Sequence, residues 1–155
     1  MSEGLGLSNY QIDNHFRGNP LYGGCLSKDE LVNISPNNKF WVINLQDSVL
    51  PGSHWVAVID IKLKDSNPDY CIYFDPYGVY PPPSIVSFME KSDKPLQYVC
   101  DTFQDLDSTK CGQYCLMVID SILKSVPYKK LFDDLLDEDD VARNERLIKK
   151  FKLRK

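Results

Sequence analysis

The 155-residue sequence lacks the patterns that mark several large classes of protein. No apolar run approaches the roughly 20 residues that a bilayer-spanning helix needs. The N-terminus lacks the basic region and hydrophobic stretch of a secretory signal peptide, and no internal repeat is present. We therefore expect a protein that is not secreted, has no membrane contact and forms one domain over residues 1–155.

The sequence also offers few histidine and cysteine patterns that could bind a metal ion or form disulfides. Only two histidines are present, and the five cysteines form no CxxC pair, so no zinc-finger spacing exists. The odd number of cysteines does not suit a framework of disulfides. Reduced thiols in an intracellular setting are therefore the simplest interpretation.

Charge is unevenly distributed along a chain whose net charge is −4. Residues 143–155 hold seven cations and one anion, and an acidic block at residues 133–140 precedes them. Such a basic tail, covering about residues 140–155, can contact nucleic acid or an acidic partner. A solvated terminal helix whose acidic start and basic end suit its dipole explains the same order. We favour the second interpretation and leave a DNA contact open.

Hydrophobic patterning predicts strands in the middle of the chain and helices at both ends. The predicted strands cover residues 40–45, 54–61, 70–75 and 96–100. The predicted helices cover residues 9–16, 28–33, 85–91, 111–124, 128–136 and about 140–152. Capping boxes begin the first two helices at Ser8 and Ser27, Ser84 is the predicted cap of the third, and GNPLYGG is predicted as turns. This segregation of strands and helices indicates an α+β fold.

The segment QDLDSTKCGQYC, residues 104–115, is the most informative part of the chain. An apolar run follows Cys111 and Gly112, which places the cysteine at the first turn of a buried helix. A helix N-terminus carries positive partial charge and unpaired N–H groups, and both favour the reactive thiolate form of cysteine. A nucleophile there still needs a base and a group that orients the base.

His54 and Asp75 supply those two groups. If the hairpin between the second and third predicted strands is symmetric, paired positions sum to about 129, and His54 then faces Asp75. A carboxylate fixes the tautomer of an imidazole and stabilises the imidazolium. The amide of Gln104 can stabilise an oxyanion together with the backbone N–H of Cys111, and Gly112 lets the backbone approach closely.

Each of these residues also has an ordinary interpretation. His54 alone could be a histidine at a strand end, and Asp75, before Pro76, could be a turn residue. Cys111 alone could be a buried apolar cysteine. The combination favours chemistry because order, spacing and structural context agree. The remaining histidine, His15, is predicted to be structural or at the surface.

The segments GSHWVAV, YCIYFDPYG and Q-x6-CG-x-YC resemble the cysteine proteases that include the adenovirus maturation protease, adenain. The ubiquitin-like-protein-specific proteases share that fold. The early segment LYGGCLSKDEL is similar to proteases of this type from virophages and Maverick/Polinton elements. The resemblance covers about residues 20–123. It implies a papain-like α+β fold with a mostly antiparallel central sheet and the nucleophile at the start of a buried helix.

The resemblance also implies a role for each matching residue. The implied catalytic groups are the base His54, the orienting acid Asp75, the nucleophile Cys111 and the oxyanion donor Gln104. Trp55 and Gly112 are implied to line a narrow substrate cleft. Lys110 departs from the deSUMOylating members, which usually have Asp before the nucleophile. The spacing of seven between Gln104 and Cys111 matches adenain better.

We therefore expect a cysteine endopeptidase that cleaves viral capsid or core precursors at small, glycine-containing sites during virion maturation. A chain this short has little room for the surface that grips a folded ubiquitin-like protein. A deconjugating protease and a catalytically silent interaction module are the alternatives. The chemistry needs no cofactor, although the resemblance leaves an activating peptide or DNA open. We expect a monomer that works in the virion and at an intracellular replication site, in cytoplasm or nucleus.

Overall fold

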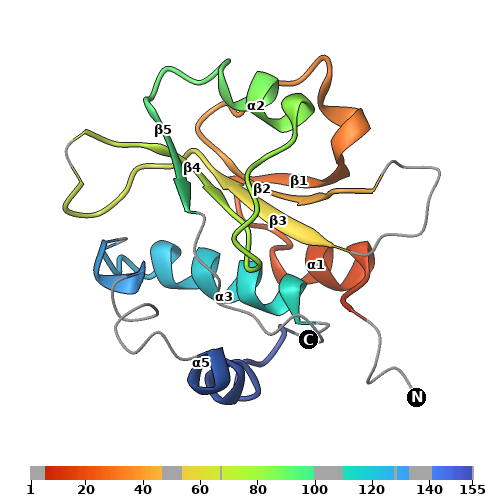
Figure 1. The fold of residues 1–155 in the computed structure, drawn as a ribbon, viewed down its shortest axis with the longest axis vertical. Coiled ribbons are helices and arrows are strands. Elements are labelled where there is room, and N and C mark those ends of the chain that lie inside the picture. Colours follow the sequence, from red (N-terminus) through yellow and green to blue (C-terminus); the bar gives the residue numbers. More distant parts are fainter. Residues whose placement is uncertain are drawn as a thin grey trace.

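The computed structural model describes residues 6–46, 54–66, 68–99, 110–127, 129–132 and 141–154, without the side chains of residues 141–143 (Figure 1). In those ranges no helix combines the length and the apolar character needed to cross a membrane. The elements, in chain order, are α1 (Asn9–His15), β1 (Tyr22–Ser27), the 3-10 helix η1 (Lys28–Leu31), β2 (Phe40–Asn44), β3 (Trp55–Ile59), β4 (Cys71–Phe74), α2 (Pro83–Met89), β5 (Leu96–Val99), α3 (Cys111–Leu123) and α5 (Val141–Ile148).

The five strands form one mixed sheet in the order β1-β2-β3-β4-β5. The predicted antiparallel pairing holds for the three central strands, β2, β3 and β4. The outer strands β1 and β5 each run parallel to their neighbour. The central strand β3 is buried along its whole length, which explains its nearly continuous hydrophobic sequence.

Helices cover both faces of this sheet (Figure 1). α1 and α3 pack on one face and α2 and η1 on the other, so the buried side chains form two clusters. Side chains of β3 alternate between the two faces of the sheet and so enter both clusters. Trp55, Ala57 and Ile59 belong to the first cluster, and Val56 and Val58 belong to the second. The α3 helix is thereby held directly against the strand that follows His54.

The predicted strands are confirmed in place, with slightly shorter ends. The strand β1 was not predicted, since residues 18–24 look like turns. The position of Gly23 explains why this strand contains glycine. A Cβ there would lie 2.3 Å from the ring of Trp41, so the strand needs glycine to pass the indole.

Within the described residues the helix predictions are confirmed with three corrections. The last predicted helix, about residues 140–152, ends earlier, at Ile148. The predicted helix 28–33 is the short 3-10 helix η1. α2 begins before the predicted cap Ser84, because Pro82 occupies the N-cap and Pro83 opens the helix. Most of the predicted helix 128–136 and the caps at residues 139–140 lie outside the described residues.

Candidate active site

Three predicted catalytic residues come together at one end of the sheet. His54 precedes β3, Asp75 follows β4, and Cys111 is the first residue of α3. The backbone N–H of Trp55, the residue after His54, donates to the Sγ atom of Cys111 at 3.4 Å. The start of α3 is therefore anchored beside the start of β3.

The Asp75 carboxylate is fully buried and holds the imidazole of His54. The distance from His54 Nε2 to Asp75 Oδ1 is 2.8 Å. The backbone N–H of Tyr77 donates to the same oxygen at 2.8 Å, and that of Gly78 donates to the Asp75 carbonyl at 2.8 Å. Gly78 has a φ of 79°, which glycine adopts without strain. The sequence Asp-Pro-Tyr-Gly thus forms a turn that fixes the carboxylate.

The predicted hairpin register was wrong by two residues. The pairs Ala57–Phe74 and Val58–Tyr73 sum to 131, so the position opposite His54 is that of Tyr77. The two rings stack with centroids 4.6 Å apart and an interplanar angle of 29°. Because side chains alternate with a period of two, a shift of two keeps each side chain on its own face of the sheet. The histidine and carboxylate therefore still meet.

The protonated form of His54 is favoured at neutral pH. Burial lowers the pKa of His54, but the hydrogen bond to Asp75 and the nearby Cys111, together with the charges of both groups, outweigh burial and raise this pKa to about 9. Nε2 is bound to Asp75, and Nδ1 has no hydrogen-bond partner among the described residues. Nδ1 is thus the nitrogen left to face Cys111. An imidazolium there favours the thiolate.

Cys111 is only 3% exposed and occupies the first turn of α3. The side chain of Lys110, at the N-cap, makes no capping hydrogen bond. First-turn N–H groups have no partner within the helix, so they can stabilise an oxyanion next to the nucleophile. The helix therefore places the predicted nucleophile beside N–H donors that could stabilise the charge its attack would create.

Trp55 and Gly112, the predicted substrate-cleft residues, lie against each other. Trp55 is 8% exposed, and its indole Nε1–H donates to the carbonyl oxygen of Leu7 at 2.9 Å. A Cβ at Gly112 would lie 3.0 Å from Leu7 Cδ1 and 3.1 Å from Trp55 Cδ1. Glycine therefore allows α3 to pack tightly here. Gln104 lies outside the described residues, so its oxyanion role stays a prediction.

Two residues at the site were not found from the sequence. Tyr77, whose ring stacks on His54, follows Asp75 by two positions, and an aromatic residue in that turn was the available signal. Leu7 left no such signal. Its contact with Trp55 joins residues 48 positions apart, which no local pattern reveals.

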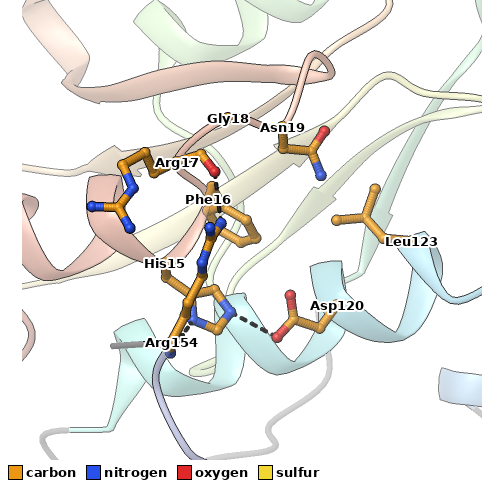
Figure 2. A pocket seen from close by; sticks show the side chains of 8 residues that line it. All are labelled: His15, Phe16, Arg17, Gly18, Asn19, Asp120, Leu123 and Arg154. Atoms are coloured by element: carbon orange, nitrogen blue, oxygen red, sulfur yellow. Dashed lines mark hydrogen bonds and ion pairs between the residues drawn. The ribbon is translucent and has the colours of Figure 1, made fainter.

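A second histidine–carboxylate pair lies elsewhere, in an open cavity of about 420 Å³ shown in Figure 2. His15 Nε2 lies 2.7 Å from Asp120 Oδ2, and the backbone N–H of Arg154 donates to His15 Nδ1 at 2.9 Å. Because Nδ1 accepts a hydrogen bond, the ring proton is on Nε2. None of the described residues that line this cavity is a cysteine. The pair joins the C-terminal segment to α1 and α3.

Within the part of the chain that the structure describes, no group of three or more His, Cys, Asp or Glu side chains could hold a metal ion. The predicted nucleophile, base and carboxylate lie together at one end of the sheet, and this arrangement is suited to covalent catalysis by cysteine.

No protein-family model and no curated protein matches this sequence. Among solved structures, the fold is that of a viral protease with papain-like architecture, so the expected α+β protease fold is confirmed. One such neighbour is the pS273R protease of African swine fever virus (ASFV). Its crystal structure has a TM-score of 0.65 and 18% sequence identity, covering 99% of this chain and 70% of that chain. A second, selenomethionine structure of the same protease has a TM-score of 0.49 and 23% identity, covering 74% and 45%.

Proposed function

We propose that this protein is a cysteine endopeptidase with Cys111 as its nucleophile. The observation that carries the proposal is the buried Asp75 carboxylate bound to His54, whose pKa is raised to about 9, beside a cysteine at a helix N-terminus. Charged imidazole, thiolate and helix N-terminus together suit attack on a carbonyl carbon. Likeness of the fold to that of a viral protease supports the same class.

The reaction proceeds in two halves. The Cys111 thiolate attacks the peptide carbonyl carbon, a C–S bond forms, and the carbonyl oxygen takes the negative charge. The Cys111 N–H, with Gln104 as the further predicted donor, stabilises that oxyanion. Protonated His54 gives its proton to the leaving amine as the C–N bond breaks. Water then attacks the thioester while His54 accepts its proton, which releases the acid and restores the thiolate.

The proposed substrates are viral capsid or core precursors, cut at small, glycine-containing sites in extended segments. Their support is the fold of a viral protease and the buried Trp55 next to the nucleophile. The proposed setting is the virion and the intracellular replication site, with the chain acting as a monomer and related to proteases of virophages or Maverick/Polinton elements. DNA is a proposed contact of exposed cations in the C-terminal part of the chain, namely Arg146, Lys149, Lys150, Lys152 and Arg154.

Alkylation by iodoacetamide across about pH 4–9, with mass spectrometry resolving every cysteine, tests the proposal. Burial raises the pKa of Cys25, Cys71 and Cys115 above the usual value, so these thiols serve as slow internal standards. Cys111 should react fastest at neutral and mildly acidic pH, and His54→Ala should remove that advantage. A Cys111 that reacts like the other thiols would contradict the proposal.

A second assay separates the two kinds of protease substrate. Short glycine-containing peptides should be cleaved, and folded ubiquitin-like conjugates should be cleaved no faster. Preference for the folded conjugate would instead favour a deconjugating protease. Cys111→Ala should abolish turnover of either substrate while the circular dichroism spectrum stays unchanged.

A further inference from the structure

The backbone N–H of Trp55 donates to Cys111 Sγ at 3.4 Å, and both residues are buried. β3 pairs with β4 only from Ala57 onward, so this N–H lies beyond the end of that pairing. A hydrogen bond to an ionised group is about twice as strong as one between neutral groups. The Trp55 amide therefore favours the charged form of the nucleophile.

Three further contacts hold Trp55 in place. Its indole Nε1–H donates to the Leu7 carbonyl at 2.9 Å. Its own carbonyl accepts the thiol proton of Cys115 at an S···O distance of 3.5 Å. Its ring edge packs on α3 at Gly112, where an added Cβ would lie 3.1 Å from Trp55 Cδ1. The donor to Cys111 is thus fixed through backbone and ring at once.

One helix supplies both sulfur contacts. Cys111 and Cys115 are one turn apart on α3, so the same helix face binds the N–H and the C=O of Trp55. Complete burial, together with the charge of Cys111, raises the pKa of Cys115 well above the usual thiol value. Cys115 therefore keeps the proton that it donates to the carbonyl.

We infer that Leu7 and Cys115 are positioning residues for the nucleophile, because through Trp55 they hold the backbone N–H that donates to Cys111 Sγ. This inference rests on the proposed function. Leu7 acts through its main-chain carbonyl, so the segment before α1 completes the site. The competing explanation is packing alone, in which these residues stabilise the fold without affecting the charge of the sulfur.

The chain offers a matched control for each contact. Trp55→Phe removes the indole donor at the site. Trp41→Phe removes an equally buried indole donor, which binds the Pro36 carbonyl at 3.0 Å in the cluster on the opposite face of the sheet. Cys115→Ala removes the thiol at the site, and Cys71→Ala removes a fully buried thiol in that opposite cluster.

The readout is the rate at which iodoacetamide alkylates Cys111 in the absence of substrate. This rate is measured near neutral pH and again about two pH units higher. The urea midpoint of each variant is measured alongside, to report its stability. Both site variants should lower the ratio of the neutral to the alkaline rate about tenfold, the factor that corresponds to about 1.4 kcal/mol. Both control variants should leave this ratio unchanged even where they lower stability. For Cys115→Ala, kcat should fall while KM stays constant.

An unchanged rate ratio in Cys115→Ala and Trp55→Phe would overturn the inference and leave packing as their role. If Trp55→Phe does not fold, Cys115→Ala decides alone, because it leaves the indole in place. A wild-type Cys111 whose reactivity does not depend on His54 is a different result. It contradicts the proposed function, and the inference is rejected with it.

Discussion

At the residue scale, the site depends on how firmly each reactive group is oriented. His54 is bound by Asp75 and stacked on Tyr77, and Asp75 in turn accepts the backbone N–H of Tyr77. The three residues from Asp75 to Tyr77, directly after β4, therefore fix the ring of His54. The two substitutions that disturb this arrangement are expected to differ in severity.

His54→Ala should lower kcat for peptide hydrolysis by about 10²–10⁴, the usual contribution of a general acid–base group. Asp75→Asn should cost less, because an amide still occupies the buried position beside the ring. His15→Ala is the control, since His15 also binds a carboxylate but no cysteine is among the described residues that line its cavity. An Asp75→Asn loss as large as that of His54→Ala would show that the carboxylate does more than orient.

The charge on His54 also makes stability depend on pH. The folded-state pKa is about 9, above the unfolded value of about 6.5, so the folded state binds the proton more tightly. This contribution to the free energy of unfolding is complete below about pH 6.5 and is lost as pH rises through about 9. The free energies of unfolding of wild type and His54→Gln, measured by urea titration at a series of pH values, should therefore converge as pH rises through this window. Parallel curves would contradict a raised pKa.

At the element scale, the first turn of α3 is packed without spare room. Gly112→Ala should destabilise the fold by about 1–2 kcal/mol, because Leu7 and the tethered Trp55 must move to admit the methyl group. Gly18→Ala is the control, since nothing lies within 4 Å of its added Cβ and only its φ of 82° is strained. Urea unfolding measures the stability of both variants. Slower alkylation of Cys111 in Gly112→Ala, but not in Gly18→Ala, would show that the structural change lies at the start of α3.

The elements differ in how far the sequence predicts them. The periodicity of residues 111–123 and the apolar runs of β2, β3 and β4 reflect local burial, so these elements were predicted in place. β1 and the hairpin register depend on contacts between residues that are distant in sequence, such as the contact of Gly23 with Trp41. The predicted contact between His54 and Asp75 survived the register error because a shift of two residues keeps each side chain on its own face. Leu7 could not be predicted, because nothing local marks a carbonyl that will meet an indole.

At the scale of the whole molecule, two buried layers share one strand. Trp41 lies in the cluster under α2, and Trp55 lies in the cluster under α3. Since β3 contributes side chains to both, neither layer can lose its packing without exposing the other. Each tryptophan is therefore a reporter for one layer of the same cooperative unit.

Trp55→Phe and Trp41→Phe proteins should each unfold in a single transition, as expected for one domain. Within each variant, the urea midpoint from the remaining tryptophan's fluorescence should coincide with that from far-ultraviolet circular dichroism. The comparison is made inside one variant, because the two differ in stability. Separate midpoints would show that the layers unfold independently.

The wide sequence spacing of the contacts around Cys111 has a kinetic consequence. They join residues separated by 48, 56 and 60 positions, within a sheet whose outer strands pair in parallel. Closing long loops is slow, because the chain loses conformational entropy before the native contacts form and offset that loss. During refolding, helical structure should appear early and a reactive sulfur late, when α3 docks. A nascent chain would then carry an unreactive Cys111 until α3 docks on the sheet, which would delay the proposed cleavage of neighbouring proteins.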